Sequence, residues 1–226
     1  MIVLPRLYPI LDAGCFHDAL GLITAAEELA SAGVTLIQYR NKAGSAGKML
    51  QDAWKLKKRA LDIESQNPHV SQKRRDMGHP EVDDFIRLIM NDRADLALAA
   101  EFDGVHVGQD DLLPESVRSI IGPERWLGVS THNPEQLAEA DKTSADYLAI
   151  GPVFSTFSKD KPDPVVGLEG VRRARSLTRK PLVAIGGITR ANAASVIEAG
   201  ADSVAVISDL LREPRKSAEE FFRVLR

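Results

Sequence analysis

The sequence of 226 residues has one cysteine, no excess of positive charge and no long apolar run. Because Cys15 stands alone, an intrachain disulfide is excluded and a reducing compartment is expected. The formal net charge of -3, with basic residues scattered among acidic ones, argues against a nucleic-acid partner. No basic leader and no stretch of membrane-spanning length is visible. These absences predict a cytoplasmic protein without a membrane partner.

Short apolar runs alternate with amphipathic stretches along the chain. We expect buried strands at 7–11, 34–39, 86–90, 104–107, 126–129, 147–150, 182–185 and 203–207. Strands that alternate with helices favour a parallel α/β sheet. Eight such units in a chain of this length predict a single (β/α)8 TIM barrel over 1–226, with its active site at the carboxyl ends of the strands. An open doubly wound sheet is the structural alternative, which periodicity does not exclude.

Two helix boundaries and one insertion can also be predicted. The stretch 13–32 is expected to be one helix, with an apolar stripe that includes Leu20 and a left-handed cap at Gly33. Asn133, followed by a proline, predicts the N-cap of a later helix. The polar region 64–80 contains prolines and a basic cluster and interrupts the regular alternation. We expect it to be an inserted, mobile loop.

The end of the second predicted strand carries an amide and two cations. Gln38, Arg40 and Lys42 alternate along the chain, so they share one face of the strand. Arginine offers a planar fork of donors and lysine a compact charge, and both suit a phosphorylated ligand. A solvated basic strand end is the competing interpretation.

Two aspartates follow the neighbouring strands. Asp92 comes after the third predicted strand and Asp111 after the fourth. Neighbouring strands lie about 4.8 Å apart, so these carboxylates can reach one ion. Mg²⁺ often takes one or two carboxylates together with phosphate oxygens and water. Each aspartate alone is better interpreted as a cap or turn residue, but together beside Arg40 and Lys42 they predict a Mg²⁺ site.

The later strands complete the predicted rim. Ser130 ends the fifth strand, and the long loop 151–164 follows the sixth with hydroxyls and a lysine. Gly186 and Gly187 follow the seventh strand and Ser208 follows the eighth. Backbone amides and hydroxyls in these two places are typical of a phosphate site in such barrels. For the long loop, an ordinary flexible connection is the alternative.

Taken together, the chain resembles the thiamine-phosphate synthase (thiamine-phosphate pyrophosphorylase) family over essentially its whole length outside 64–80. The motifs that carry the resemblance are Tyr8-Pro9-Ile10-Leu11-Asp12, Gln38-x-Arg40-x-Lys42, Asn91-Asp92, His106-Val107-Gly108-Gln109-Asp110-Asp111, Gly128-Val129-Ser130, Asp146-Tyr147-Leu148-Ala149-Ile150-Gly151-Pro152-Val153-Phe154 and Ala184-Ile185-Gly186-Gly187-Ile188. The resemblance implies a Mg²⁺-dependent barrel enzyme. It would join 4-amino-2-methyl-5-hydroxymethylpyrimidine diphosphate to a thiazole phosphate, giving thiamine phosphate and diphosphate.

The resemblance also implies a role for each matching residue. The residues that would bind the pyrimidine diphosphate are Gln38, Arg40, Lys42, Asn91, Ser130 and Lys159, with Tyr39 and Asn41 as further substrate contacts. Those that would bind the thiazole phosphate are Thr156, Phe157, Ser158, Gly187, Ile207 and Ser208. The Mg²⁺ ligands would be Asp92 and Asp111. Arg40, Lys42, Ser130 and Lys159 would act in catalysis. The bond to diphosphate would break largely before the thiazole nitrogen attacks, so the site would supply a cation clamp rather than a nucleophile.

Several questions stay open. Phe157 stands where the family has proline, which predicts a looser loop and weaker thiazole affinity. A thiazole tautomerase-like isomerase would share the phosphate end and His132, but it would not need the clamp. A non-catalytic phosphate-binding barrel is the other alternative. Cys15 is interpreted as a packing residue and His106 as a hydrogen-bonded structural histidine. The oligomeric state, a homo-oligomer included, is not determined by the sequence.

Overall fold

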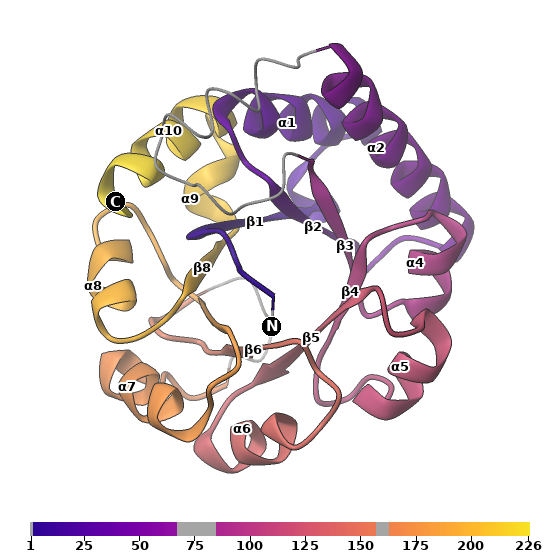
Figure 1. The fold of residues 1–226 in the computed structure, drawn as a ribbon. Coiled ribbons are helices and arrows are strands. Elements are labelled where there is room, and N and C mark those ends of the chain that lie inside the picture. The colour runs from indigo at the N-terminus through magenta and orange to yellow at the C-terminus, as the bar shows by residue number, and fades with distance from the viewer. Residues whose placement is uncertain (1, 67–84, 157–162) are drawn as a thin grey trace.

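The computed structural model describes residues 2–66, 85–156 and 163–226. Eight parallel strands close into a barrel in chain order, with β8 paired to β1 (Figure 1). The strands are β1 (Leu7–Asp12), β2 (Leu36–Arg40), β3 (Arg87–Asn91), β4 (Gly104–Val107), β5 (Trp126–Thr131), β6 (Tyr147–Ile150), β7 (Leu182–Ile185) and β8 (Ser203–Val206). The prediction of a (β/α)8 barrel is confirmed, and the open sheet is excluded.

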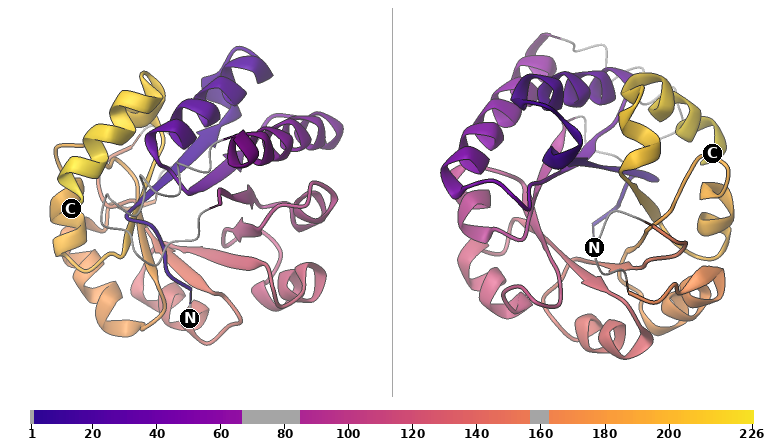
Figure 2. Two further views of the ribbon diagram at one scale, coloured as in Figure 1. Left: turned by 45° about the horizontal axis from the view of Figure 1, so that its top comes forward. Right: turned by 180° about the vertical axis from the view of Figure 1, so that it is seen from behind.

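Helices form an outer ring around the barrel (Figures 1 and 2). They are α1 (Ala19–Ala32), α2 (Ala46–Gln66), α4 (Ala94–Ala99), α5 (Pro114–Ile121), α6 (Pro134–Asp141), α7 (Gly167–Leu177), α8 (Ala193–Glu198), α9 (Ser208–Leu211) and α10 (Pro214–Val224). None of these described helices combines the length and the apolar character needed to cross a membrane. Helix α2 includes 64–66, so the first residues of the predicted insertion are helical, and the rest of it, 67–80, lies outside the described residues.

The start of the first helix differs from the prediction. A short 3-10 turn (Ala13–Cys15) precedes α1, which begins at Ala19 because the side chain of Asp18 accepts a hydrogen bond from the amide of Gly21 at 2.9 Å. Leu20 is 71% exposed and therefore outside the buried stripe. The interpretation of Cys15 as a packing residue is wrong, because it is exposed.

The two predicted helix caps are confirmed. Gly33 ends α1 in the left-handed region with a φ of 105°, a conformation that glycine adopts without steric cost. The side chain of Asn133 accepts from the amide of Gln136 at 2.8 Å, directly before Pro134 begins α6.

Apolar side chains fill two separate layers. The larger layer lies between the strands and the helices, and the smaller one lies inside the barrel. The interior layer consists of Leu4, Tyr8, Ile10, Leu36, Ile89, Tyr147, Ala149, Val183 and Ala205. The segment before β1 lies across the open end of the barrel (Figure 1), and its Leu4 belongs to the interior layer. The lower interior is thus packed and apolar, and the polar side chains that follow on the same strand faces lie above it.

A repeated aspartate clamps neighbouring strands at the amino-terminal edge of the barrel. Asp103, Asp146 and Asp202 precede β4, β6 and β8, and their carboxylates accept the backbone amides of Leu88, Leu127 and Leu182 at 2.8, 2.7 and 2.8 Å. A cation from the helix layer binds each carboxylate: Lys57, Arg118 and Arg175, respectively. Each clamp therefore joins two strands and one helix through charge-assisted hydrogen bonds.

We expect Asp146→Ala to lower the free energy of unfolding by about 2 kcal/mol. The substitution leaves the amide of Leu127 and the guanidinium of Arg118 without their carboxylate partner. The Asp202 side chain is 48% exposed against 29% for Asp146, so Asp202→Ala should cost less. Urea unfolding followed by circular dichroism measures both. Equal stability of wild type and Asp146→Ala would show that the clamp contributes nothing.

Candidate active site

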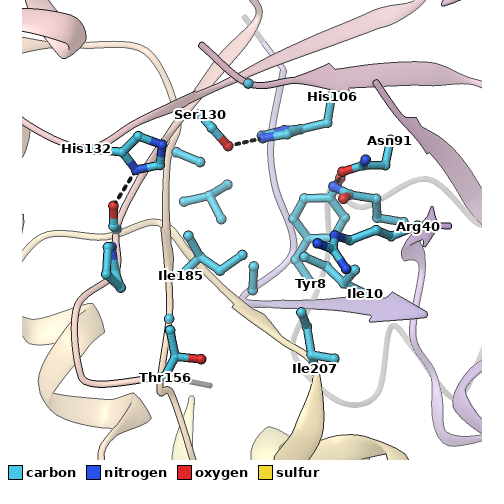
Figure 3. A pocket seen from close by; sticks show the side chains of 18 of the residues that line it. Tyr8, Ile10, Arg40, Asn91, His106, Ser130, His132, Thr156, Ile185 and Ile207 are labelled. Atoms are coloured by element: carbon cyan, nitrogen blue, oxygen red, sulfur yellow. Dashed lines mark hydrogen bonds between the residues drawn. The ribbon is translucent and has the colours of Figure 1, made fainter. Parts of the chain in front are cut away.

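A cavity of about 890 Å³ with both charged and apolar side chains in its wall opens at the carboxyl ends of the strands. It gathers the predicted site residues Gln38, Arg40, Lys42, Asn91, Asp92, Asp111, Ser130, Thr156, Gly187, Ile207 and Ser208. Figure 3 shows Arg40, Asn91 and Tyr8 on one side of this cavity, with Thr156 and Ile185 across from them. Phe157, Ser158 and Lys159 lie outside the described residues, so their predicted contacts stay predictions.

The cationic wall of the cavity comes from β2 and the residues after it. Arg40 donates to the Asp12 carboxylate at the end of β1, and both side chains are largely buried. Lys42 is 55% exposed, and its Nζ lies 2.5 Å from Oδ2 of Asp92. Sequence reasoning missed Asp12, although the β1–β2 register sets it directly opposite Arg40.

Tyr39 and Asn41 lie outside the cavity. Tyr39 is fully buried and directed toward the helices, where its hydroxyl donates to Asp52 at 3.4 Å. The Asn41 side chain folds onto the following turn and accepts the amide of Gly44 at 2.7 Å. Because strand side chains alternate between faces, the neighbours of Gln38 and Arg40 point the other way. Neither side chain lines the cavity in this structure, and the predicted substrate contacts of these two residues stay predictions.

Asp92 and Asp111 face one another at the ends of β3 and β4. Burial raises the pKa of Asp92, and the adjacent Asp111 raises it further, while Lys42 opposes this effect. Asp111 also accepts the amide of Gly108 at 2.7 Å, as a turn residue would. Asp92 does not cap the next helix, since the N-cap position of α4 is Arg93.

This carboxylate pair fits a divalent cation. A positive ion between two adjacent carboxylates relieves the repulsion between their negative charges. No group of three or more His, Cys, Asp or Glu side chains that could hold a metal occurs among residues 2–66, 85–156 and 163–226. The remaining ligands would then be phosphate oxygens and water, which is the binding mode that Mg²⁺ favours.

A row of hydrogen bonds crosses the barrel interior beneath the cavity. It links Gln38, Tyr8, Tyr147, His106 and Ser130 at successive distances of 3.0, 2.9, 3.1 and 2.8 Å. We call these side chains the interior row; its Ser130 end faces the cavity in Figure 3. The prediction of His106 as a buried, hydrogen-bonded histidine is confirmed. Burial lowers its pKa to about 4, so the ring is neutral near pH 7.

The opposite rim is made by backbone and hydroxyl groups. Gly186 and Gly187 have φ values of 99° and 63°, and a side chain at Gly187 would lie 2.5 Å from the carbonyl oxygen of Ser155. Ile207 and Ser208 follow β8 beside them on the cavity wall. Glycine is needed here because two backbone segments approach closely.

The closed barrel and the charged cavity at the carboxyl ends of its strands define a (β/α)8-barrel enzyme. The family model described as thiamine monophosphate synthase matches residues 83–210. A thiamine-phosphate synthase of Koribacter versatilis is 58% identical over 225 residues, which cover 98% of this chain and 96% of that relative. The chain therefore belongs to the thiamine-phosphate synthase family, whose members are transferases.

More distant relatives agree. A thiamine-phosphate synthase of Shouchella clausii is 40% identical, with 91% of this chain and 88% of the relative covered. Among solved structures, a thiamine phosphate pyrophosphorylase from Pyrococcus furiosus superimposes with a TM-score of 0.78 at 30% identity, with 97% of this chain and 95% of that chain covered. The similarity thus extends over the early cationic wall as well as the late rim.

Proposed function

We propose that this enzyme condenses 4-amino-2-methyl-5-hydroxymethylpyrimidine diphosphate with a thiazole phosphate, giving thiamine phosphate and diphosphate in a Mg²⁺-dependent reaction. One observation carries the proposal: the cationic wall of Gln38, Arg40 and Lys42 and the Asp92–Asp111 pair line the same cavity as the glycine and hydroxyl rim. A cavity with two separate anion-binding sides suits two phosphorylated substrates. The activity in the names of the relatives supports the same reaction.

The early strands would bind the departing diphosphate. Arg40 and Lys42 supply charge, while Asn91 and Ser130 supply polar groups from β3 and β5. Asp92 and Asp111 would hold Mg²⁺, which when bound supplies positive charge to the leaving oxygens. These groups stabilise the charge that develops as the carbon–oxygen bond breaks, largely before the thiazole nitrogen attacks.

The late strands would bind and orient the acceptor. Gly187 offers its backbone to the thiazole phosphate, and Thr156 and Ser208 offer hydroxyls. Holding both rings in one cavity converts a reaction between two solutes into one between bound neighbours. Lys159 would add a cation between the two sides, and this role stays a prediction.

Turnover with both substrates tests the proposed function. Purified protein should release thiamine phosphate and diphosphate in equal amounts, only when Mg²⁺ and both substrates are present. Isomerisation of the thiazole substrate without the pyrimidine would favour the tautomerase alternative. Binding of both ligands without any product would favour a non-catalytic barrel.

We also propose a cytoplasmic setting, because the single cysteine allows no intrachain disulfide to form. Size-exclusion chromatography with light scattering determines whether the enzyme is a homo-oligomer.

A further inference from the structure

The interior row forms a continuous path along which hydrogen-bond donation can run from Gln38 to Ser130. The Nε2 amide group of Gln38 donates to the hydroxyl of Tyr8. The hydroxyls of Tyr8 and Tyr147 lie 2.9 Å apart, and either can be the donor. With Tyr8 donating to Tyr147, the Tyr147 proton is available for Nδ1 of His106 at 3.1 Å, where the imidazole tautomer decides which atom donates. A neutral imidazole that accepts at Nδ1 carries its proton on Nε2, and this proton is donated to Oγ of Ser130.

The number of protons on each group of the row does not change near neutral pH. Burial lowers the pKa of His106 to about 4 and raises the pKa of Tyr8 and of Tyr147 above the ordinary value for tyrosine. Each tyrosine hydroxyl therefore keeps one proton near neutral pH, and the imidazole keeps one on a single nitrogen.

The consequence falls on Ser130, which ends the row on β5 and lines the cavity, as Gln38 does at the other end. A hydroxyl carries one proton to donate and accepts through its lone pairs. Because Ser130 accepts from His106 within the wall, its own proton remains for a group in the cavity. A neutral serine held in this way is a fixed donor, which suits an anionic oxygen.

We propose that Tyr147 is a positioning residue for Ser130. It holds His106 in the Nε2-protonated tautomer and thereby directs the Ser130 proton toward an anionic oxygen of the bound diphosphate. The identity of that anion rests on the proposed function. Tyr147 is fully buried and does not line the cavity, so it acts only through its neighbours.

Gly128 shows that the contact between Tyr147 and His106 is built into the wall. A Cβ atom at this position would lie 2.2 Å from Cζ of Tyr147 and 2.4 Å from Nδ1 of His106. Real Cβ atoms do not approach other atoms this closely, so only glycine leaves the space in which the two rings meet. Gly128 lies two residues before Ser130 in β5, on the same face of the strand.

Tyr147→Phe removes one hydroxyl and keeps the aromatic ring, so it tests the proposal directly. In wild type, the ¹⁵N chemical shifts of His106 should show a protonated Nε2 and an unprotonated Nδ1. Since the chain has five histidines, His106→Gln identifies the signals by their loss. In Tyr147→Phe, Nδ1 has lost its donor, and a share of the ring should move to the Nδ1-protonated form.

The affinity for an anion should change with the tautomer. Calorimetric titration with inorganic diphosphate and Mg²⁺ should show about tenfold weaker binding to Tyr147→Phe, the loss expected for one hydrogen bond to a charged group. In turnover assays, kcat should fall by a similar factor while KM for the thiazole phosphate stays unchanged. If the role of Tyr147 were purely structural, the substitution would change thermal stability without lowering kcat selectively while KM for the thiazole phosphate stayed unchanged.

Ser203→Ala is the matched control. It removes another buried strand hydroxyl, but one that donates to the carbonyl oxygen of Arg6 and does not line the cavity. It should leave the His106 tautomer, the diphosphate affinity and kcat unchanged. An Nδ1-protonated His106 in wild type, or an unchanged tautomer and affinity in Tyr147→Phe, overturns the proposal. If diphosphate binding and the tautomer respond as expected but no thiamine phosphate forms, the positioning role is supported and the proposed function fails.

Discussion

Asp92→Asn and Asp111→Asn should each lower Mg²⁺-dependent turnover by about a hundredfold or more. Each substitution removes one charge from the pair that faces a common point at the ends of β3 and β4. In the proposed site the protein supplies two carboxylate ligands, and phosphate oxygens and water supply the others. Replacing one carboxylate therefore removes a large part of the protein's contribution to cation binding.

Asparagine is the right replacement at both positions. Asp92 has a φ of 62°, and asparagine tolerates this left-handed conformation better than alanine does. At Asp111, the amide oxygen can still accept the backbone amide of Gly108. Both variants should therefore fold, and each should be at least as stable as wild type without Mg²⁺, because the repulsion between the carboxylates is relieved.

Turnover kinetics at limiting Mg²⁺ measure the expected loss of activity in the two variants, and thermal unfolding measures their stability. Mg²⁺ with inorganic diphosphate should raise the unfolding temperature of wild type and raise it less in both variants. Asp95→Asn is the control, since Asp95 is exposed, pairs with Arg93 and does not line the cavity. Wild-type activity in both site variants at limiting Mg²⁺ would refute the metal assignment.

Alternation along single strands accounts for the part of the site that sequence can predict. Gln38 and Arg40 line the cavity because residues two apart in a strand share a face. Lys42 lies two residues beyond the end of β2 and lines the same cavity. The same rule places the Tyr39 side chain on the opposite face, where it is fully buried, and its predicted substrate contact stays a prediction. The left-handed cap at Gly33 was likewise predictable, because the left-handed conformation favours glycine.

Closure of the barrel determines the part that sequence could not predict. Tyr8 and Tyr147 are 139 residues apart and meet only because β1 and β6 face each other across the interior. No local pattern distinguishes their hydroxyls from those of surface tyrosines. The clamp at Asp146 likewise depends on Arg118 arriving from a helix 28 residues earlier in the chain. The start of α1 was misplaced because a side-chain cap at Asp18 overrides the apolar periodicity before it.

Arg40→Ala should weaken binding of the pyrimidine diphosphate by about a hundredfold, and Lys42→Ala by about tenfold. The Arg40 side chain is 18% exposed and fixed by Asp12, so its charge is poorly screened and its orientation is set in advance. Lys42 is 55% exposed, and solvent screens its charge. Loss of Arg40 also leaves the Asp12 carboxylate without its partner, and that negative charge would repel the diphosphate.

Adding Asp12→Asn to Arg40→Ala should therefore recover part of the lost affinity. Calorimetric titration of the pyrimidine diphosphate with Mg²⁺, without the thiazole substrate, measures binding apart from turnover. Arg172→Ala is the control, because Arg172 is an exposed cation that pairs with Glu169 and does not line the cavity. Thiazole-phosphate affinity should change little in either site variant, since the opposite rim of Gly187 and Ser208 is intact. If Arg40→Ala weakened the thiazole phosphate more than the pyrimidine diphosphate, the assignment of the two sides would be reversed.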